Sequence, residues 1–244
     1  MKVLFLDLET SPNLAYVWGL WQQNVAITQM VNSTEVICFG ARWGDSKKVI
    51  FKSIHHDGKK AMLDALHELM EEADVLVGWN SQAFDSKHIK REFVENGYLP
   101  PSPYKELDLM RVVKSQFKFP SNKLDYVSQK LGVGAKVKHS GFQLWIDCMA
   151  GDKKAWKEMK EYQIQDVNLL LDLYDILQPW IKNHPNRALH DGNPDGCSNC
   201  ASSNLERRGV TRTVSHTYQR YQCRDCGKWM RGNKPIEKIT YRSI

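Results

Sequence analysis

Short apolar runs bounded by turn residues recur along the first half of the chain. This pattern is typical of buried strands, and it predicts them at 3–9, 35–43, 47–53 and 74–79. Gly44-Asp45-Ser46, between the second and third runs, predicts a hairpin turn.

Helical periodicity appears between and after these runs. Helices are expected at 59–73, 84–97, 123–132 and 153–177, and a short strand leading into a helix is expected at 107–117. Strands followed by alternating strands and helices predict a mixed α/β sheet flanked by helices. We assign this fold class to a first domain, residues 1–181.

The rest of the chain has a different composition. Residues 182–196 are rich in Pro, Gly, Asn and Asp, which is typical of a linker. Residues 197–244 contain few large aliphatic side chains. We therefore expect a small second domain that needs a covalent or metal staple, because burial alone would not fold it.

Composition excludes a membrane protein. The chain has 244 residues, of which 42% are hydrophobic and 25% charged, and no apolar run approaches the roughly 20 residues of a membrane span. Charged residues interrupt the N-terminal apolar run too early for a secretion signal. A cytoplasmic protein is expected.

The positive charge is confined to the C-terminal part. The formal net charge is +6, with +7 on residues 182–244 and −1 on the first 181 residues. This distribution favours a polyanionic partner such as nucleic acid. A solvated basic surface is the alternative.

Four of the six cysteines form two pairs. Cys197-x-x-Cys200 and Cys223-x-x-Cys226 have the spacing of a four-cysteine zinc site, with two disulfides or reactive pairs as the alternative. Disulfides are rare in cytosolic proteins, so we favour one structural Zn²⁺. It would supply the staple that the second domain needs.

Acidic residues occupy positions where burial is costly. Asp7 and Glu9 leave the same face of the first strand, and Asp85 follows another strand and opens a helix. Tyr162 and Asp166 share one helix face. Taken singly, each has a structural explanation: a turn cap, a helix N-cap and an amphipathic surface position, respectively.

Together these motifs resemble those of the DEDD family of 3′→5′ exonucleases, which have an RNase H-like fold. The motifs are Asp7-Leu8-Glu9-Thr10, Asn80-x-x-x-Phe84-Asp85 and Tyr162-x-x-x-Asp166. The resemblance spans residues 1–178 and includes the segment 123–138. One branch of the family has histidine five residues before the last Asp, where this chain has Glu161. The match is therefore to the tyrosine branch (DEDDy), which resembles proofreading domains of DNA polymerases.

The resemblance implies a site for two Mg²⁺ or Mn²⁺ ions. Such ions prefer carboxylate oxygens, and a pair of them can neutralise the charge of a reacting phosphodiester. Asp7 would bridge both ions, Glu9 and Asp166 would complete the shell of the first, and Asp85 would hold the second. Tyr162 would orient the attacking water. The family motifs also imply substrate contacts at Leu8, Thr10, Asn80 and Phe84.

The second domain resembles zinc ribbons of transposase-like and phage proteins, most closely in YQCRDCGKW. Basic and aromatic side chains alternate there, and they could hold phosphates and stack bases. The candidate contacts are Arg212, Tyr218, Arg220, Tyr221 and Trp229. Covering the zinc site and binding a protein are alternatives.

We therefore expect a metal-dependent 3′→5′ exonuclease that acts on single-stranded 3′ ends, more readily of DNA. It resembles a bacteriophage product, which would work in the bacterial host cytoplasm, with a replication or repair protein as a candidate partner. The alternatives are an RNA exonuclease, an endonuclease of the same fold and a non-catalytic binding module. We expect Asp108 to be structural and His139 to be a loop histidine. Tyr16, Trp18 and Trp21 could stack bases, pack in the core or form a flap.

Overall fold

The structure of the chain is a computed structural model that describes residues 1–238, 240 and 241. It divides into two compact units, which we call the sheet unit (Lys2–Tyr174) and the ribbon unit (Asp175–Ile244 together with Met1). The division falls near the end of the longest helix, α6 (Lys153–Leu177). Among the described residues, no helix is both long and apolar enough to cross a membrane.

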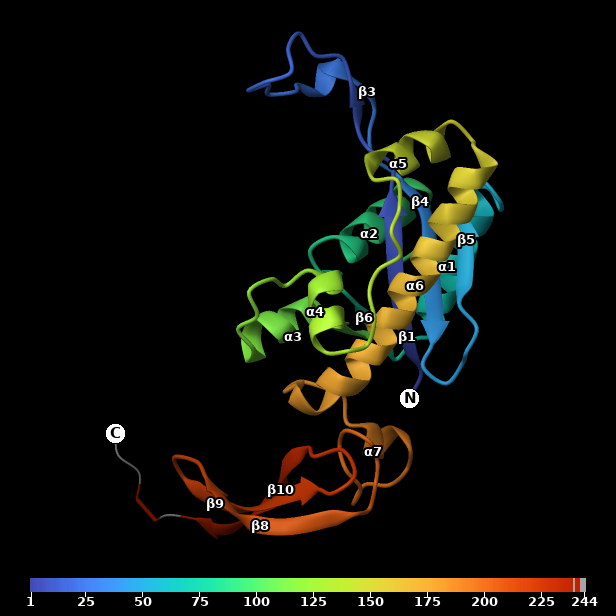
Figure 1. Cartoon of the computed structure of the whole chain (residues 1–244). Helices are drawn as coiled ribbons and strands as arrows, with labels where there is room; N and C mark the ends of the chain where they lie inside the picture. The colour runs from blue at the N-terminus through green and yellow to red at the C-terminus, as the bar shows by residue number, and fades with distance from the viewer. Residues whose placement is uncertain (239, 242–244) are drawn as a thin grey trace. The chain divides into compact units, whose positions relative to one another are not determined.

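The sheet unit is built on a mixed sheet with the strand order β5-β4-β1-β6-β7 (Figure 1). The strands are β1 (Val3–Thr10), β4 (Val36–Trp43), β5 (Ile50–Ser53), β6 (Val75–Gly78) and β7 (Lys105–Asp108). Central strand β1 pairs antiparallel with β4 and parallel with β6. The predicted mixed α/β class is therefore confirmed, and so is the hairpin between β4 and β5.

Helices cover both faces of this sheet. Alternate β1 residues Leu4, Leu6 and Leu8 pack against α1 (Lys59–Glu72) and α2 (Asp85–Glu95). On the opposite face, β4 residues pack against α5 (Phe142–Met149) and α6. Because side chains alternate along a strand, Asp7 and Glu9 point to the face that α6 covers.

The remaining helices of the sheet unit are short. The predicted strand-to-helix segment is β7 followed by α3 (Leu109–Gln116), and the helix predicted at 123–132 is α4 (Leu124–Lys130). Helix α5 was not expected from the pattern. Its Leu144 and Cys148 are buried, whereas Phe142 remains 65% exposed.

An arm projects from the sheet directly after β1. It consists of β2 (Leu14–Ala15), a 3-10 helix (Ile27–Gln29) and β3 (Met30–Asn32), and Figure 1 shows it extending beyond α5. Its aromatic residues Tyr16, Trp18 and Trp21 are exposed. Core packing of these rings, one of the alternatives, is therefore wrong.

The ribbon unit contains a sheet with the order β10-β9-β8. The strands are β8 (Leu205–Arg212), β9 (His216–Cys223) and β10 (Trp229–Lys238), and the preceding elements are a 3-10 helix (Gln178–Trp180) and α7 (Arg187–His190). The Lys228 ammonium donates to the backbone carbonyl oxygens of Pro179 (3.1 Å) and Ile181 (2.6 Å). Arg187 N–H donates to Ser198 O at 2.8 Å, so part of the segment 182–196 is bonded to the ribbon.

Candidate functional site

The acidic residues of the first motif lie within a paired strand. Asp7 is opposite Gly40 of β4, and Glu9 is opposite Cys38. Asp7 therefore does not cap a turn, which was its structural explanation. Both side chains leave β1 on the face toward α6.

Asp85 is placed beside β1 by the turn that follows β6. Asn80 in this turn has a positive φ of 62°, and its N–H donates to Asp108 Oδ1 at 3.0 Å. Asp85 is 4% exposed, and its Oδ1 accepts from Leu8 N–H at 3.2 Å. The same Asp108 oxygen accepts from Arg111 N–H at the start of α3, which supports the structural role expected for Asp108.

The third motif is buried on α6, not exposed at its surface. Tyr162 is 6% exposed and Asp166 is 1% exposed. Gly40 lets this helix approach the sheet, because a Cβ atom there would lie 3.0 Å from both Gln163 Oε1 and Val167 Cγ2. Since Gly40 pairs with Asp7, α6 comes closest to the sheet next to the first candidate acid.

The four carboxyl groups converge, because Asp85 accepts from Leu8 N–H between Asp7 and Glu9, and α6 packs against Gly40 opposite Asp7. Burial raises the pKa of Asp7 well above its usual value, and the carboxylates of Asp85, Asp166 and Glu9 raise it further. Burial raises the pKa of Glu9 to about 8, with Asp166 and Asp85 adding to the rise, and burial raises that of Asp85 to about 7. The structure thus brings together side chains from β1, α2 and α6.

Two oxygens of this cluster have no partner. Within the described part of the chain, Asp7 Oδ2 and Asp166 Oδ1 are buried without a hydrogen bond. Buried polar atoms normally find partners, and buried like charges need compensation. The donor set therefore fits hard divalent cations. Among the described residues, only the four cysteines bring three or more ligand atoms within 4.8 Å of one another. No three of these carboxylates lie as close together as the ligands of a single ion would.

A lysine that the sequence did not single out occupies this cluster. Lys136 Nζ lies 2.5 Å from Asp166 Oδ2 and 2.7 Å from Tyr162 OH. Its charge also lowers the pKa values of Asp7 and Glu9. The Lys136 N–H donates to Asp125 Oδ1 of α4 at 2.9 Å and so anchors the loop that carries this lysine.

An aromatic-walled cavity opens beside the acids. Its volume is about 320 Å³, and it is lined by Glu9, Thr10, Ser11, Pro12, His139, Gly141, Phe142 and Trp145. His139 packs edge-on to Tyr162, with ring centroids 4.9 Å apart, and a hydrogen bond with Trp145 offsets part of the rise that burial causes in the pKa of Glu9. His139 is thus part of the site's surroundings. Thr10 also lines the cavity, and its role as a substrate contact stays a prediction.

The other expected contacts of the sheet unit differ in exposure. Phe84 is 38% exposed and lies immediately before Asp85, and Asn80 is half-buried in the turn. Leu8, in contrast, is 3% exposed and packs in the core. Its side chain has almost no surface to offer a substrate, because it faces α1 and α2 and not α6.

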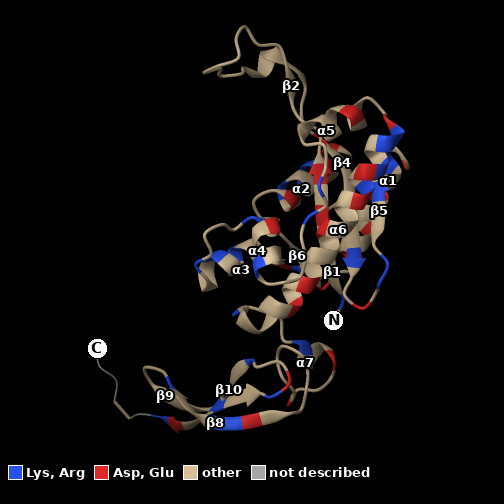
Figure 2. Ribbon diagram, viewed as in Figure 1, with Lys and Arg blue, Asp and Glu red and all other residues tan. Residues whose placement is uncertain are grey.

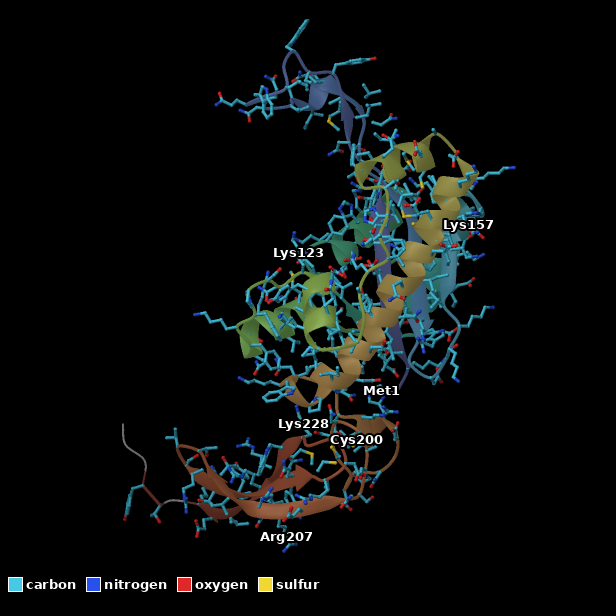
Figure 3. The ribbon with its side chains drawn as sticks, in the orientation of Figure 1. Met1, Lys123, Lys157, Cys200, Arg207 and Lys228 are labelled. Atoms are coloured by element: carbon cyan, nitrogen blue, oxygen red, sulfur yellow. The ribbon has the colours of Figure 1, made fainter. Side chains whose placement is uncertain are left out.

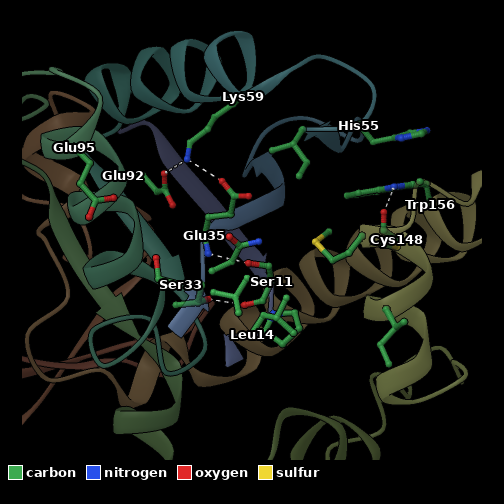
Figure 4. A pocket seen from close by; sticks show the side chains of 18 residues that line it. Ser11, Leu14, Ser33, Glu35, His55, Lys59, Glu92, Glu95, Cys148 and Trp156 are labelled. Carbon is green, nitrogen blue, oxygen red and sulfur yellow. Dashed lines mark hydrogen bonds and ion pairs between the residues drawn. The ribbon is translucent and has the colours of Figure 1, made fainter. Parts of the chain in front are cut away.

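A larger cavity of about 950 Å³ lies on the other side of Ser11 and Pro12 (Figure 4). Its lining includes a group of ion pairs, in which Lys59 Nζ lies 3.0 Å from Glu92 Oε2 and 2.9 Å from Glu35 Oε2. Glu92 also accepts from Val36 N–H at 3.0 Å. Arg91 Nη2 lies 3.2 Å from Glu92 Oε1, so two cations compensate the two glutamates, and we assign this group a structural role.

The four cysteines of the ribbon unit form a cluster (Cys200 is labelled in Figure 3). The Sγ atoms of Cys197 and Cys226 are 3.6 Å apart, and those of Cys200 and Cys223 are 3.7 Å apart. A disulfide would bring sulfur atoms to about 2.05 Å, whereas tetrahedral Zn–S bonds of about 2.3 Å place sulfurs about 3.8 Å apart. The cluster fits one structural zinc ion.

One face of the ribbon sheet carries stacked cations and rings. Arg220 and Arg208 lie 4.7 and 5.8 Å from the centre of the Trp229 ring, and Arg231 lies 4.3 Å from that of Tyr218. The strand register places the other two expected contacts on the opposite face, because Tyr221 pairs with Arg207, and Arg212 with Thr217. The expected set of five thus divides between two faces.

Comparison with known proteins points in the same direction. A family model described as RNase H superfamily matches residues 28–178, which include Asp85, Tyr162 and Asp166. A search of curated proteins finds no match. The family B DNA polymerase from the hyperthermophilic archaeon Pyrobaculum calidifontis has a similar fold, with a TM-score of 0.54 at 16% identity. The similarity covers 73% of this chain and 25% of the polymerase chain.

Proposed function

Because the chain belongs to the RNase H superfamily, we propose that it is a metal-dependent 3′→5′ exonuclease that hydrolyses phosphodiester bonds at single-stranded 3′ ends. The observation that carries the proposal is the convergence of four carboxyl groups from β1, α2 and α6, of which Asp85 and Asp166 are buried and Asp7 and Glu9 half-buried. Burial raises their pKa values, and the Lys136 charge offsets this rise only in part, as expected for a cation site. DNA is the favoured substrate because the similar fold occurs in a DNA polymerase.

The carboxylates would hold two Mg²⁺ or Mn²⁺ ions. Asp7 would contact both, Glu9 and Asp166 the first, and Asp85 the second. Bound ions would neutralise the charge that develops on the phosphate and lower the pKa of water. Asp7 Oδ2 and Asp166 Oδ1, which lack hydrogen-bond partners among the described residues, are candidate ligand atoms.

Tyr162 would orient the attacking water. Burial raises the pKa of the phenol far above its usual value, and the carboxylates of Asp166, Glu9 and Asp7 raise it further. The phenol therefore keeps its proton at neutral pH and cannot act as a general base. Lys136, 2.7 Å from the Tyr162 oxygen, fixes where that hydroxyl points.

The ribbon would hold the nucleic acid without taking part in the chemistry. Four thiolates leave a zinc ion no open position, so the metal would stabilise this unit. The exposed Trp229 and its neighbouring Arg208 and Arg220 combine a stacking surface with positive charge. Such surfaces bind single strands with little sequence preference.

The proposal is tested with labelled DNA and RNA strands that carry either a free or a blocked 3′ end, with and without Mn²⁺. We expect products that shorten stepwise from the free 3′ end of DNA. Asp7→Asn and Asp166→Asn should lower the rate by at least about a hundredfold, whereas Asp172→Asn, at an exposed position of the same helix, should not.

Other outcomes would support the alternatives. Cleavage of circular single strands would indicate an endonuclease, and faster degradation of RNA would indicate an RNA exonuclease. If Asp7→Asn retained full turnover, the carboxylate site would not be the catalytic centre. No degradation at all, combined with strand binding, would favour a non-catalytic module.

A further inference from the structure

The arm between β1 and β4 lacks charge altogether. From residue 10 to residue 34 the sequence contains no Lys, Arg, His, Asp or Glu, although a quarter of the whole chain is charged. Figure 2 shows the region around β2 without a charged residue. An uncharged surface cannot hold phosphate groups by charge, so its contacts must be apolar or stacking contacts.

The apolar side chains of the arm face solvent. Trp18 is 100% exposed, Trp21 84% and Tyr16 79%. Aliphatic residues Leu20 (86%) and Ile27 (90%) are exposed beside them. Contiguous exposed apolar side chains usually mark a binding surface.

This exposure is imposed by a hydrogen-bonded scaffold. Gln29 N–H donates to Ala26 O, and its side chain accepts from Ala26 N–H and donates to Tyr16 O, each at 2.9 Å. Tyr16 N–H donates to Gln29 O at 2.9 Å. Gln29 thus connects the segment at Tyr16 to the segment at Ala26. The exposed rings therefore extend from a hydrogen-bonded hairpin.

The arm is rooted beside the candidate site. Ser11 N–H donates to Glu35 O at 2.8 Å, and Ser11 Oγ accepts from Glu35 N–H at 2.9 Å. Ser11 and Pro12 also line the cavity that contains Glu9. The far wall of that cavity includes His139 and the exposed ring of Phe142. An apolar, aromatic surface therefore runs from Glu9 toward the arm.

We propose that the arm is a stacking platform for unpaired bases of the strand whose end lies at the four carboxylates. This inference rests on the proposed function. Nucleic acid is favoured over a protein partner because the cavity at Glu9 leads to the root of the arm. Every base has a flat face, so stacking on Trp18, Trp21 and Tyr16 tolerates any sequence. The exposed Lys138, in the loop that precedes His139, supplies positive charge for phosphates, which the arm lacks.

The consequence is a dependence of activity on strand length. A strand too short to reach the arm gains nothing from it, whereas a longer one gains stacking contacts. The test compares kcat/KM on single-stranded DNA of about 15 nucleotides with kcat/KM on thymidine 5′-(p-nitrophenyl phosphate). The long-to-short ratio should fall about tenfold or more in the double variant Trp18→Ala/Trp21→Ala.

Matched variants separate stacking from loss of apolar surface. Trp18→Phe/Trp21→Phe keeps the rings and should recover most of the ratio. Val94→Ala/Leu99→Ala removes exposed apolar side chains elsewhere in the sheet unit and should leave the ratio unchanged. An unchanged ratio in Trp18→Ala/Trp21→Ala would overturn the proposal and would leave a protein partner as the occupant of the arm.

Photo-crosslinking tests the arm even if the chain hydrolyses nothing. A strand carrying 5-iododeoxyuridine at one position at a time is bound in Ca²⁺ and irradiated. Crosslinks to the peptide that contains Trp18 and Trp21 are expected when the label is internal and not when it is at the 3′ end. Crosslinks that never reach this peptide would overturn the arm proposal, whereas absence of hydrolysis with arm crosslinks would overturn only the exonuclease proposal.

Discussion

At the residue scale, the site is an excess of buried negative charge that a single lysine partly compensates. The motifs indicated the acids and Tyr162 through their combined resemblance to the exonuclease family, because each residue taken singly has a structural explanation. Lys136 could not be found in this way, since a lysine in a glycine-containing loop has no unusual context. Only the fold brings its Nζ to within 2.5 Å of Asp166 Oδ2.

Replacing Lys136 by Met separates its two effects. Removing the positive charge from a cation site should tighten binding of Mn²⁺ to the protein, measured by isothermal titration calorimetry. The same change leaves the Tyr162 hydroxyl without its donor, so kcat should fall at least about tenfold. Weaker Mn²⁺ binding in Lys136→Met would contradict the view that Lys136 occupies a cation position.

The raised pKa values predict how stability depends on pH in the absence of divalent ions. Unfolded carboxyl groups have pKa values near 4, whereas folded Glu9 and Asp85 have values of about 8 and 7. Between these limits the folded protein binds more protons than the unfolded chain, so the free energy of unfolding falls as pH rises. The melting temperature should therefore drop from about pH 6.5 to about pH 8.

The histidines with shifted pKa values contribute little to the pH dependence of stability between about pH 6.5 and about pH 8. Burial lowers the pKa values of three histidines below their usual value near 6.5, so they act at lower pH; these are His56, His88 and His184. Addition of Mg²⁺ or Mn²⁺ should abolish the drop, because the ions compensate the carboxylates. A melting temperature that rises with pH in the absence of ions would contradict the proposed repulsion.

At the element scale, the site depends on how closely α6 approaches the sheet. Short apolar runs predicted β1, β4 and β6, and helical periodicity predicted α6, near their observed positions, because these elements bury most of their apolar side chains. Gly40 was available as a signal, since glycine inside a strand often marks close backbone approach. Its partner could not be deduced, because packing of α6 on β4 is a long-range contact.

Helix α5 and the arm were not predicted, for different reasons. Helix α5 is a short run whose polar and apolar residues give little periodicity, and its start depends on Gly141 with a φ of 71°. The arm has the apolar composition of a core segment, so sequence alone could not distinguish exposure from burial. Its exposure follows from the hydrogen bonds of Gln29, which no hydrophobic pattern reveals.

Gly40→Ala is expected to disturb the site through α6. The added methyl group would contact Gln163 and Val167 at 3.0 Å and force the helix outward. Overpacking of this kind costs about 1–3 kcal/mol, measured as the free energy of unfolding in urea. Activity should fall as well, because Tyr162 and Asp166 move with the helix. Gly44→Ala, where a Cβ would have ordinary contacts of at least 3.5 Å, is the matched control.

If Gly40→Ala lost stability without losing activity, the spacing between α6 and β1 would not set the catalytic geometry. If it lost neither, the close approach at Gly40 would be unimportant.

At the scale of the whole molecule, charge and chemistry are separated between units. The sheet unit holds the carboxylates, and the basic excess lies on the C-terminal residues. The cysteine spacing predicted a four-sulfur cluster, which the structure contains. The surface contacts were less predictable, because strand register decides that Tyr221 and Arg212 lie on the face opposite Trp229.

The cationic face of the ribbon predicts the salt dependence of binding. Replacing Arg208, Arg220 and Arg231 by Ala should weaken binding to single-stranded DNA and reduce the slope of log K against log salt by about 2. Fluorescence anisotropy over a salt series measures this slope. Lys153→Ala/Lys154→Ala/Lys157→Ala removes equal charge from α6 and should change the slope less. An unaltered slope in the arginine variant would contradict binding by this face.

The central claim is that Asp7, Glu9, Asp85 and Asp166 jointly hold a pair of divalent ions. The most direct measurement is an anomalous difference map from crystals grown with Mn²⁺. We predict two peaks about 4 Å apart within the carboxylate cluster, with Asp7 contacting both and Lys136 displaced. A map at saturating Mn²⁺ with no peak among these carboxylates, and with Lys136 still bonded to Asp166, would contradict the account.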